Sequence, residues 1–527
     1  MRTSLIAIVA LVIVVAFAMP RQAVARGAAK DAVPFGVQVI DDLTGRGVPL
    51  VELETTSKLR YVTDSAGYAA IDAPELLNQK AHFRISSFGY EYPADGFGIR
   101  GAALDVKSGE IVTLKIKRTS VAERLYRITG AGIYADSLKL GKKAPIEQPL
   151  LNAQVVGQDS VQSAVYRDRL YFFWGDTAKL SYPLGLFQTA GATIDWPGKG
   201  GLDPSVGLNL HYFSGKDGFA RAMAPHPGPG VMWLGGFVVI NDDQGHERML
   251  AHASRMKDLG TRLERSLVVF NDDKQVFEQL KVIDLDAPLA PDGHPFRATR
   301  GGKDHVYFPA PYPAVRVPAT WQAVTDLAQY EGYTCLRPGT RFDKDKPDFD
   351  RDSSGNLLFA WKKGTPPLMP KQLEDLVKAG RLKREELPHR LTDIDTGKPI
   401  QLHGSSVAWN DFRQKWIMIG LQVFGDSMLG EIYFAEASDP EGSWMSAKKI
   451  VTHAMPTANE PGGRAQHMDF YNPRHHPFFD QQGGRIIYFE GTYTTTFSGN
   501  PVQTPRYEYN QVMYRLDLTD ARLKLSS

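Results

Sequence analysis

Short apolar stretches separated by turn residues follow one another along most of this chain. Near residue 160, the apolar stretch Ser163–Tyr166 is followed by Arg167–Arg169 and then by the aromatic stretch Leu170–Phe173. Two strand-like stretches joined by so short a polar segment predict a β-hairpin. Asp159 precedes the first stretch and Asp176 follows the second. The two carboxylates should therefore lie at the same end of the hairpin.

Similar groups of strands recur along the chain, within 159–193, 231–270, 305–336, 405–437 and 469–518. Repeated units of three or four strands without intervening helices predict a five-bladed β-propeller over residues 152–520. Two successive sandwiches are the alternative architecture. Only residues 370–388 show helical spacing of apolar side chains, and we interpret them as a surface insertion.

Residues 34–118 form a separate set of short alternating strands with turns between them, a pattern typical of a β-sandwich. Residues 119–151 read as a connector whose stretch Arg124–Ile128 could pack on either domain. The predicted fold class is therefore all-β, with an N-terminal β-sandwich followed by the propeller.

The first 25 residues have the pattern of a signal peptide. Arg2 precedes the apolar run Leu5–Met19, and Ala23–Ala25 provides a small-x-small cleavage site. The run is short for a membrane span, so cleavage is expected rather than an uncleaved anchor. We expect a secreted or periplasmic protein with no stable membrane span after cleavage.

Composition narrows the function further. The 527 residues carry 61 Lys and Arg against 59 Asp and Glu, a net charge of +2, which offers no argument for nucleic acid as a partner. The single cysteine, Cys335, excludes an internal disulfide and lies in a strand-like run, where a buried small side chain is expected. Nothing in the composition indicates an oligomeric state.

The propeller prediction places further side chains beside the Asp159 and Asp176 carboxylates. In a propeller, the innermost strand of a blade begins at the face where the second strand ends. The stretch Ile487–Thr492 parallels Phe172–Thr177, so Glu490 is expected to end a second strand as Asp176 does. The other side chains expected at this face are Arg255, Tyr312, His403, Glu431, His467 and Asp469, with Trp174, Tyr493 and Tyr509 as aromatic surfaces for a sugar ring.

Each assignment has a structural alternative. Asp159 and Asp176 could only cap turns, and Asp469 could hold the backbone of the turn that follows it. Glu431 could be a rim residue beside a loop, and the aromatic side chains could be core packing.

The sequence gives little support for a metal or cofactor. His467, His475 and His476 match no standard zinc spacing. The run Asp348-x-Asp350-x-Asp352 is similar to a calcium loop but lacks its glycine and terminal glutamate, so a solvated loop is favoured over structural calcium. We therefore expect no cofactor.

Two stretches of the propeller region resemble known families. Asp159 with Tyr171–Thr177 is similar to the opening of five-bladed propellers of the DUF4185 type, some of which are endo-D-arabinofuranases. Residues 436–444 are similar to a blade exit found in five-bladed propeller glycosidases, including arabinanases, xylosidases and fructosidases. In the N-terminal region, the pattern Asp41-x-x-Thr-Gly resembles carboxypeptidase-regulatory-like (transthyretin-like) sandwiches.

The resemblance implies an exported glycoside hydrolase that cleaves a polysaccharide, for example an arabinofuranosyl one. Asp159 would be base or nucleophile and Glu490 the general acid, while Asp176 would orient the substrate or raise the pKa of the acid. A non-catalytic propeller that binds glycan or cell-envelope components is the alternative, since one fold hosts many functions.

Overall fold

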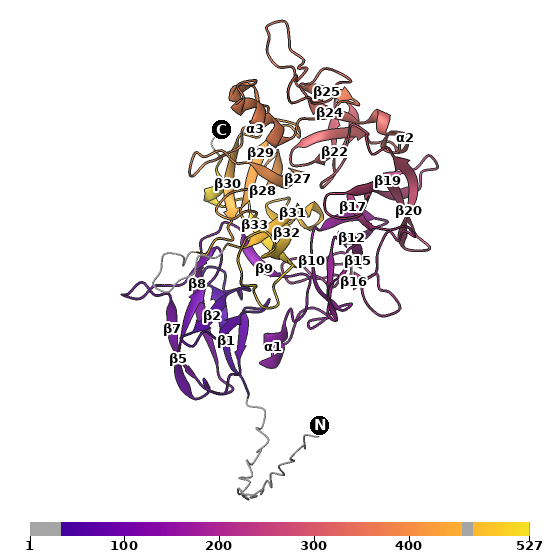
Figure 1. The fold of residues 1–527 in the computed structure, drawn as a ribbon. Coiled ribbons are helices and arrows are strands. Elements are labelled where there is room, and N and C mark those ends of the chain that lie inside the picture. Colours follow the sequence, from indigo (N-terminus) through magenta and orange to yellow (C-terminus); the bar gives the residue numbers. More distant parts are fainter. Residues whose placement is uncertain (1–32, 456–466, 526–527) are drawn as a thin grey trace, which may run out of the picture.

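The computed structural model describes residues 33–455 and 467–525, and strands dominate it (Figure 1). The predicted signal peptide, residues 1–25, lies outside the described residues. No helix in the described ranges is long and apolar enough to cross a membrane. The all-β fold class predicted from the sequence is confirmed, because the strands form a sandwich followed by five sheets of a propeller.

The N-terminal sandwich consists of two four-stranded sheets with the side chains of Val37, Val39, Leu53, Phe83 and Ile85 buried between them. One sheet has the order β4 (Tyr68–Ile71), β1 (Phe35–Asp41), β8 (Ile111–Arg118) and β6 (Tyr90–Glu91). The other has the order β3 (Arg60–Val62), β2 (Glu52–Thr55), β5 (Gln79–Ser86) and β7 (Gly101–Val106). Alternation of buried and exposed side chains along β8 is what a sheet with one solvated face requires.

Five sheets follow, and each is one blade of the propeller. The first contains β11 (Gln162–Tyr166), β12 (Arg169–Trp174), β15 (Ala190–Ile194) and β16 (His211–Tyr212). The second contains β17 (Val231–Asn241), β18 (Glu247–Met256), β19 (Arg262–Asn271) and β20 (Val276–Ile283). The third contains β21 (Phe296–Arg300), β22 (Lys303–Pro309), β23 (Pro313–Pro318), β24 (Glu331–Thr334) and β25 (Ala360–Lys363).

The fourth blade contains β27 (Leu402–Asn410), β28 (Lys415–Gln422), β29 (Ile432–Ala437), β30 (Ser446–Val451) and β26 (Thr392–Asp393). The fifth contains β31 (Asp469–His475), β32 (Ile486–Thr494), β33 (Asn510–Asp517) and β9 (Glu123–Arg127). A small extra sheet is formed by β10 (Val155–Gln158), β13 (Thr177–Lys179) and β14 (Tyr182–Leu186).

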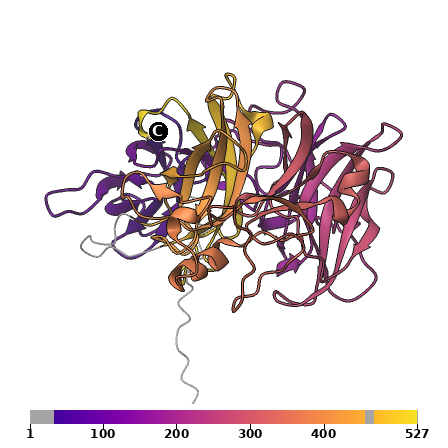
Figure 2. The same ribbon diagram turned by 90° about the horizontal axis from the view of Figure 1, so that it is seen from above.

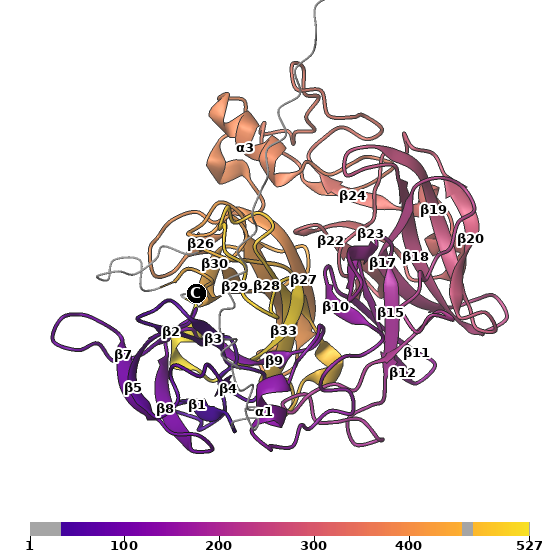
Figure 3. The same ribbon diagram turned by 60° about the horizontal axis from the view of Figure 1, so that its bottom comes forward.

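Helical segments are short and lie in the connections between strands. The α-helices are α1 (Ala135–Lys139), α2 (Trp321–Val324) and α3 (Pro370–Lys378). Within residues 33–455 and 467–525, the 3-10 turns are Leu327–Gln329, Arg384–Glu386, Pro477–Phe479 and Ala521–Leu523. Helix α3 lies in the region expected to be an insertion, and Figure 3 shows it outside the sheets.

Apolar clusters join each blade to the next and so close the ring. Blades one and two share the cluster around Tyr166 and Leu234, and blades two and three share the cluster around Leu250 and Phe308. The other neighbouring pairs are joined by clusters containing Phe296 and Leu402, Phe434 and Phe489, and Tyr488 and Phe172. Among the innermost strands, β11 contacts β17 and β27 contacts β31.

The chain closes the propeller by pairing a strand from before it with the last blade. Strand β9 pairs antiparallel with β33, with Val512 opposite Arg127 and Arg515 opposite Glu123. We expected this part of residues 119–151 to be a connector, and that expectation was wrong for β9. Pairing with β33 satisfies the backbone groups of both strands, which an isolated connector would leave to water.

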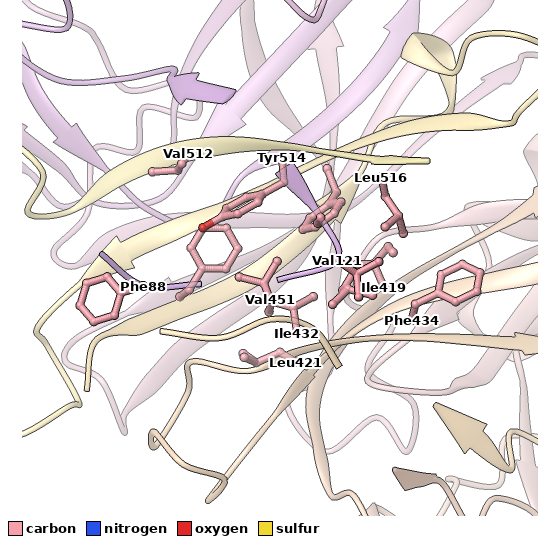
Figure 4. Close-up of a cluster of buried hydrophobic side chains, with 14 of the residues drawn as sticks. Phe88, Val121, Ile419, Leu421, Ile432, Phe434, Val451, Val512, Tyr514 and Leu516 are labelled. Atoms are coloured by element: carbon pink, nitrogen blue, oxygen red, sulfur yellow. The ribbon is translucent and has the colours of Figure 1, made fainter. Parts of the chain in front are cut away.

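The sandwich packs on the fourth and fifth blades. Figures 1 and 2 show its indigo and violet strands beside the orange and yellow ones. Phe88 of the sandwich and Val121 after it belong to the same buried apolar cluster as Ile419, Leu421 and Tyr514 of these blades (Figure 4). Packing of this kind removes apolar surface of both parts from water and holds them together.

Candidate functional site

The β11–β12 hairpin brings Asp159 and Asp176 together, as the sequence predicted. Arg167 and Asp168 form its two-residue turn with positive φ angles of 48° and 56°, which matches the twist of the two strands. At the other end, the Gly175 amide donates a 2.7 Å hydrogen bond to the backbone oxygen of Asp159, and the Asp159 amide donates to Asp176. A Cβ on Gly175 would lie 2.4 Å from Oδ1 of Asp159, so a larger residue there would displace this carboxylate oxygen.

The Asp159 carboxylate is half-buried and receives several hydrogen bonds. The Asp176 amide donates to Oδ1 over 2.9 Å, and the Tyr471 hydroxyl donates to Oδ2 over 2.8 Å. Tyr509 also donates a hydrogen bond to this carboxylate. Burial raises the pKa of Asp159, while these donors act in the opposite direction because they favour the charged form.

The Asp176 carboxyl is in a different environment. It is half-buried, and its Oδ1 has no hydrogen-bond partner. Burial, and secondarily the neighbouring Asp159 charge, raise the pKa of Asp176 to about 7. Two adjacent carboxyls with unequal numbers of hydrogen-bond donors are an arrangement in which one is ionised while the other holds a proton.

A second group of polar side chains joins blades one, three and five. The Asn472 amide donates to the Ser160 hydroxyl over 2.7 Å, and Arg474 Nε donates to the Ser163 hydroxyl over 3.2 Å. His294, which precedes β21, lies 3.2 Å from Oε1 of Gln162 through Nδ1. Pairing of β31 with β32 is irregular between Tyr471 and Arg474, and within this irregular segment Asn472 and Arg474 both reach side chains of blade one.

Glu490 lies in the middle of strand β32, which continues to Thr494. The expectation that it ends its strand, as Asp176 follows β12, was therefore wrong. Within blade five, Thr494 at the end of β32 pairs with Asp469 at the start of β31. Glu490 lies four residues before Thr494, which corresponds to about 13 Å along the strand. Glu490 is fully buried and bonded to His476 over 2.7 Å, while burial raises its pKa to about 8.

Glu431 and Asp469 were expected at the propeller face that carries Asp159 and Asp176. Both are buried, and their carboxylates accept hydrogen bonds from backbone amides of loops. Glu431 accepts a 2.9 Å hydrogen bond from the Ser427 amide and another from the Ser427 hydroxyl. It is therefore not a rim residue. Asp469 accepts a 2.6 Å hydrogen bond from the Phe497 amide, so it holds the loop after β32 rather than the turn after itself.

Arg255 makes its contacts within blade two, and Tyr312 makes its contacts between blades three and four. Arg255 contacts its own blade, through the Pro229 carbonyl at 2.9 Å and Glu264 at 3.3 Å. Tyr312 follows β22 and stacks on His389, with ring centroids 4.2 Å apart. Tyr312 therefore belongs to a different pocket, described below.

The remaining predicted residues divide into buried and peripheral ones. Trp174 and Tyr493 are buried in inter-blade cores, where Trp174 packs on Phe172 and the Tyr493 hydroxyl bonds Thr504, so neither presents a ring to a sugar. His403 is an exposed residue of β27, and His467 is half-buried opposite Ala454.

No group of three or more His, Cys, Asp or Glu side chains that could hold a metal ion occurs within residues 33–455 and 467–525. In the acidic run, Asp348 and Asp350 are ion-paired with Arg337 and Lys362, and Asp352 caps its own turn. Cys335 is buried, and burial raises the pKa of its thiol to about 11.

Sequence reasoning missed Tyr471, Asn472 and Arg474 as site residues. Their position just after Asp469 was a usable signal, because Asp469 was already expected to begin an innermost strand. Asp292, just before β21, was also missed: a Cβ on Gly235 of the neighbouring blade would lie 2.8 Å from its Oδ1. Strand β21 was not predicted, because the third unit was expected to begin at residue 305.

No protein-family model and no curated protein matches the chain. Solved structures with a similar fold include a GH43_1 enzyme from Xanthomonas citri complexed with xylotriose, at 10% identity and a TM-score of 0.32, covering 72% of this chain and 91% of that one. A putative exo-beta-1,3-galactanase from Bifidobacterium bifidum has 11% identity and a TM-score of 0.33, covering 77% and 97%. An alpha-L-arabinanase from Penicillium chrysogenum complexed with arabinobiose has 11% identity and a TM-score of 0.30, covering 76% and 99%. Likenesses this distant say nothing about the activity or substrate of this chain.

Proposed function

We propose that this chain is an exported glycoside hydrolase that cleaves a polysaccharide with the carboxyl groups of Asp159 and Asp176. One observation carries the proposal: two adjacent carboxyls differ in their hydrogen bonding. Burial raises the pKa of both, but Asp159 accepts hydrogen bonds from the Asp176 amide and the Tyr471 hydroxyl, whereas Asp176 lacks a partner on Oδ1 and has its pKa raised to about 7. Glycosidic-bond hydrolysis needs one ionised carboxylate and one protonated carboxyl.

In the proposed reaction, Asp176 donates its proton to the leaving glycosidic oxygen as the bond to the anomeric carbon breaks. Asp159 either attacks that carbon or takes a proton from the water that does. The positive charge that develops on the sugar ring is stabilised by the Asp159 anion. If Asp159 attacks the carbon, water later displaces it, gives its hydroxyl to the sugar and its proton to Asp176. If Asp159 acts as base, it keeps the proton of the attacking water, and proton exchange with solvent then returns Asp159 to its ionised form and Asp176 to its protonated form.

This assignment differs from the expectation that Glu490 is the general acid. Glu490 has no exposed surface, and its Oε1 is occupied by His476. We propose instead that Glu490 positions the site indirectly, because His476 contacts Ser163, and Ser163 in turn accepts a hydrogen bond from Arg474. Arg474 and Asn472 are the proposed contacts for sugar hydroxyls.

A non-catalytic propeller that binds glycan is the second candidate. It is favoured by the burial of Glu490, the carboxyl expected opposite Asp159. The two candidates differ in a measurable way, since a binding protein would retain the polysaccharide without producing new reducing ends.

The deciding experiment incubates the purified protein with arabinan, arabinogalactan, xylan and fructan, and measures reducing ends together with polysaccharide binding. Arabinofuranosyl polymers come first because of the resemblance carried by residues 171–177. Asp159→Asn should abolish hydrolysis, while Asp168→Asn, at the exposed turn of the same hairpin, should retain it. Binding without hydrolysis by the unmodified protein would favour the second candidate, and equal hydrolysis by Asp159→Asn would refute the first.

A further inference from the structure

A pocket of about 310 Å³ lies between the third and fourth blades. Its walls come from the β22–β23 connection, from the insertion that contains α3, and from the segment that leads into β27. It shares no lining residue with the Asp159 and Asp176 pair, and the proposed hydrolysis does not use it. Its volume is within the range of small-molecule sites.

The walls of this pocket are mainly apolar. Helix α3 and the residues before it supply Leu368, Met369 and Leu373, and the blade side supplies Ile400 and Leu402. Tyr312 and His389 also line it, and their rings stack with an interplanar angle of 23°. A flat aromatic pair favours a ligand with a planar apolar body. A sugar would lose hydration of its hydroxyls here without gaining enough hydrogen bonds in return.

Basic side chains outnumber acidic ones in the lining of this pocket. Glu374 is its acidic residue, and Arg384 already occupies that carboxylate with contacts of 2.9 and 3.0 Å. Lys378 lies 3.9 Å from the same carboxylate. Arg390 has no ion-pair partner among the described residues, and its Nε is buried without a hydrogen-bond partner. An anionic group would supply the missing acceptor.

His389 provides a second unsatisfied atom. Its Nδ1 is buried and has no partner. Burial lowers the pKa of His389 to about 4, so the ring is neutral near pH 7. With its other nitrogen engaged by the Gly442 backbone, Nδ1 can accept a hydrogen bond from a ligand.

We propose that this pocket binds a small amphipathic anion, with an aromatic body against Tyr312 and Leu373 and one carboxylate or sulfonate at Arg390. The pairing of apolar walls with an unpaired guanidinium selects such a ligand over neutral sugars and over aliphatic molecules without charge. The proposal is independent of hydrolysis at Asp159, since the two sites share no residues.

The test uses 8-anilino-1-naphthalenesulfonate as the anionic probe and N-phenyl-1-naphthylamine as its neutral counterpart, with the intact folded protein. We expect the sulfonate to bind with 1:1 stoichiometry by calorimetry. Arg390→Met keeps an apolar side chain but removes the charge, so it should weaken sulfonate binding at least about tenfold while leaving the neutral probe unchanged. Arg381→Met, an exposed arginine of the same insertion that does not line the pocket, is the matched control.

Leu373→Trp should fill the pocket and abolish binding of both probes, with circular dichroism and thermal melting to establish folding. If that variant does not fold, the half-exposed Met369→Trp serves the same purpose. Three results would overturn the proposal: absence of sulfonate binding, sulfonate binding unaffected by Arg390→Met or by the filled pocket, and displacement of the sulfonate by xylotriose, which would indicate a neutral sugar site.

Discussion

The Tyr471 hydroxyl donates a 2.8 Å hydrogen bond to Oδ2 of Asp159, and so links the fifth blade to the first. The two residues are separated by 312 positions in the sequence. Because β9 from the start of the propeller pairs with β33 of the last blade, closure of the ring sets the position of Tyr471 relative to Asp159. The proposed active site therefore depends on a complete propeller.

Replacement of Tyr471 by phenylalanine tests this link. A hydrogen bond to a charged group contributes about 1.5–3 kcal/mol, so kcat/KM should fall roughly 10- to 100-fold. The lost donor favoured the Asp159 anion, so its pKa should rise and the acidic limb of the pH profile should move to higher pH. Phe→Leu at the exposed Phe412 is the control for a surface aromatic change. An unchanged acidic limb in Tyr471→Phe would contradict the role of Asp159 as the ionised group.

The raised pKa of Asp176 predicts the basic limb of the same profile. Since the proposed acid must be protonated, kcat/KM should decline above about pH 7, by about tenfold per pH unit. Asp176→Asn should remove that limb and slow polysaccharide cleavage, with a smaller loss for aryl glycosides whose leaving group needs no proton. Profiles between pH 4 and 9 on both substrate types provide the measurement, and equal losses on both would argue against Asp176 as the acid.

Local pairing was predictable from the sequence, whereas long-range pairing was not. The β11–β12 hairpin depends on neighbouring residues, so its alternating and aromatic pattern was sufficient to place Asp159 beside Asp176. Strand β9 pairs with β33 across most of the chain, and nothing local marks that partner. Strand β21 contains Arg297 and Arg300 on an otherwise short stretch, which concealed it among the turns.

The prediction that Glu490 ends its strand was wrong for a physical reason. All nine residues of β32 are buried, so the strand lacks the alternation that marks register and end points. The apparent parallel with Phe172–Thr177 rested on a shared aromatic run, although β12 ends at Trp174 and β32 extends four residues beyond Glu490. A polar residue in the middle of a buried strand indicates an interior partner, here His476.

Burial of Glu490 predicts a pH-dependent stability. Its pKa in the folded protein, about 8, is above the unfolded value near 4.5, so its contribution to stability is fully present below about pH 4.5 and is lost as pH rises through 8. At about 1.4 kcal/mol per pH unit, the loss between pH 5 and 8 is at most about 4 kcal/mol. Urea unfolding of the wild type and of Glu490→Gln at both pH values checks this. The variant should show the flatter dependence, and parallel curves would mean that Glu490 does not titrate in this range.

The junction between sandwich and propeller predicts the largest stability effect. The Arg124 side chain, on β9, is buried and donates to the Pro49 and Phe88 carbonyls over 2.9–3.1 Å and to the Ser87 hydroxyl over 2.5 Å. Arg124→Met would leave these sandwich acceptors without donors, at a cost of about 1–3 kcal/mol for each one left unsatisfied. Because β9 also completes the fifth blade, the loss should lower the melting temperature of both parts together.

Thermal unfolding followed by calorimetry measures this effect, with the exposed Arg341→Met as control. We expect the control to melt within about 1 °C of the wild type, since surface substitutions change stability by about 0.5 kcal/mol or less. For Arg124→Met, we expect a reduction of several degrees and a single transition if the shared core of Phe88, Val121 and Ile419 keeps the parts cooperative. Two separated transitions in the wild type would instead mean that the sandwich unfolds independently, and that the Arg124 contacts do not couple it to the propeller.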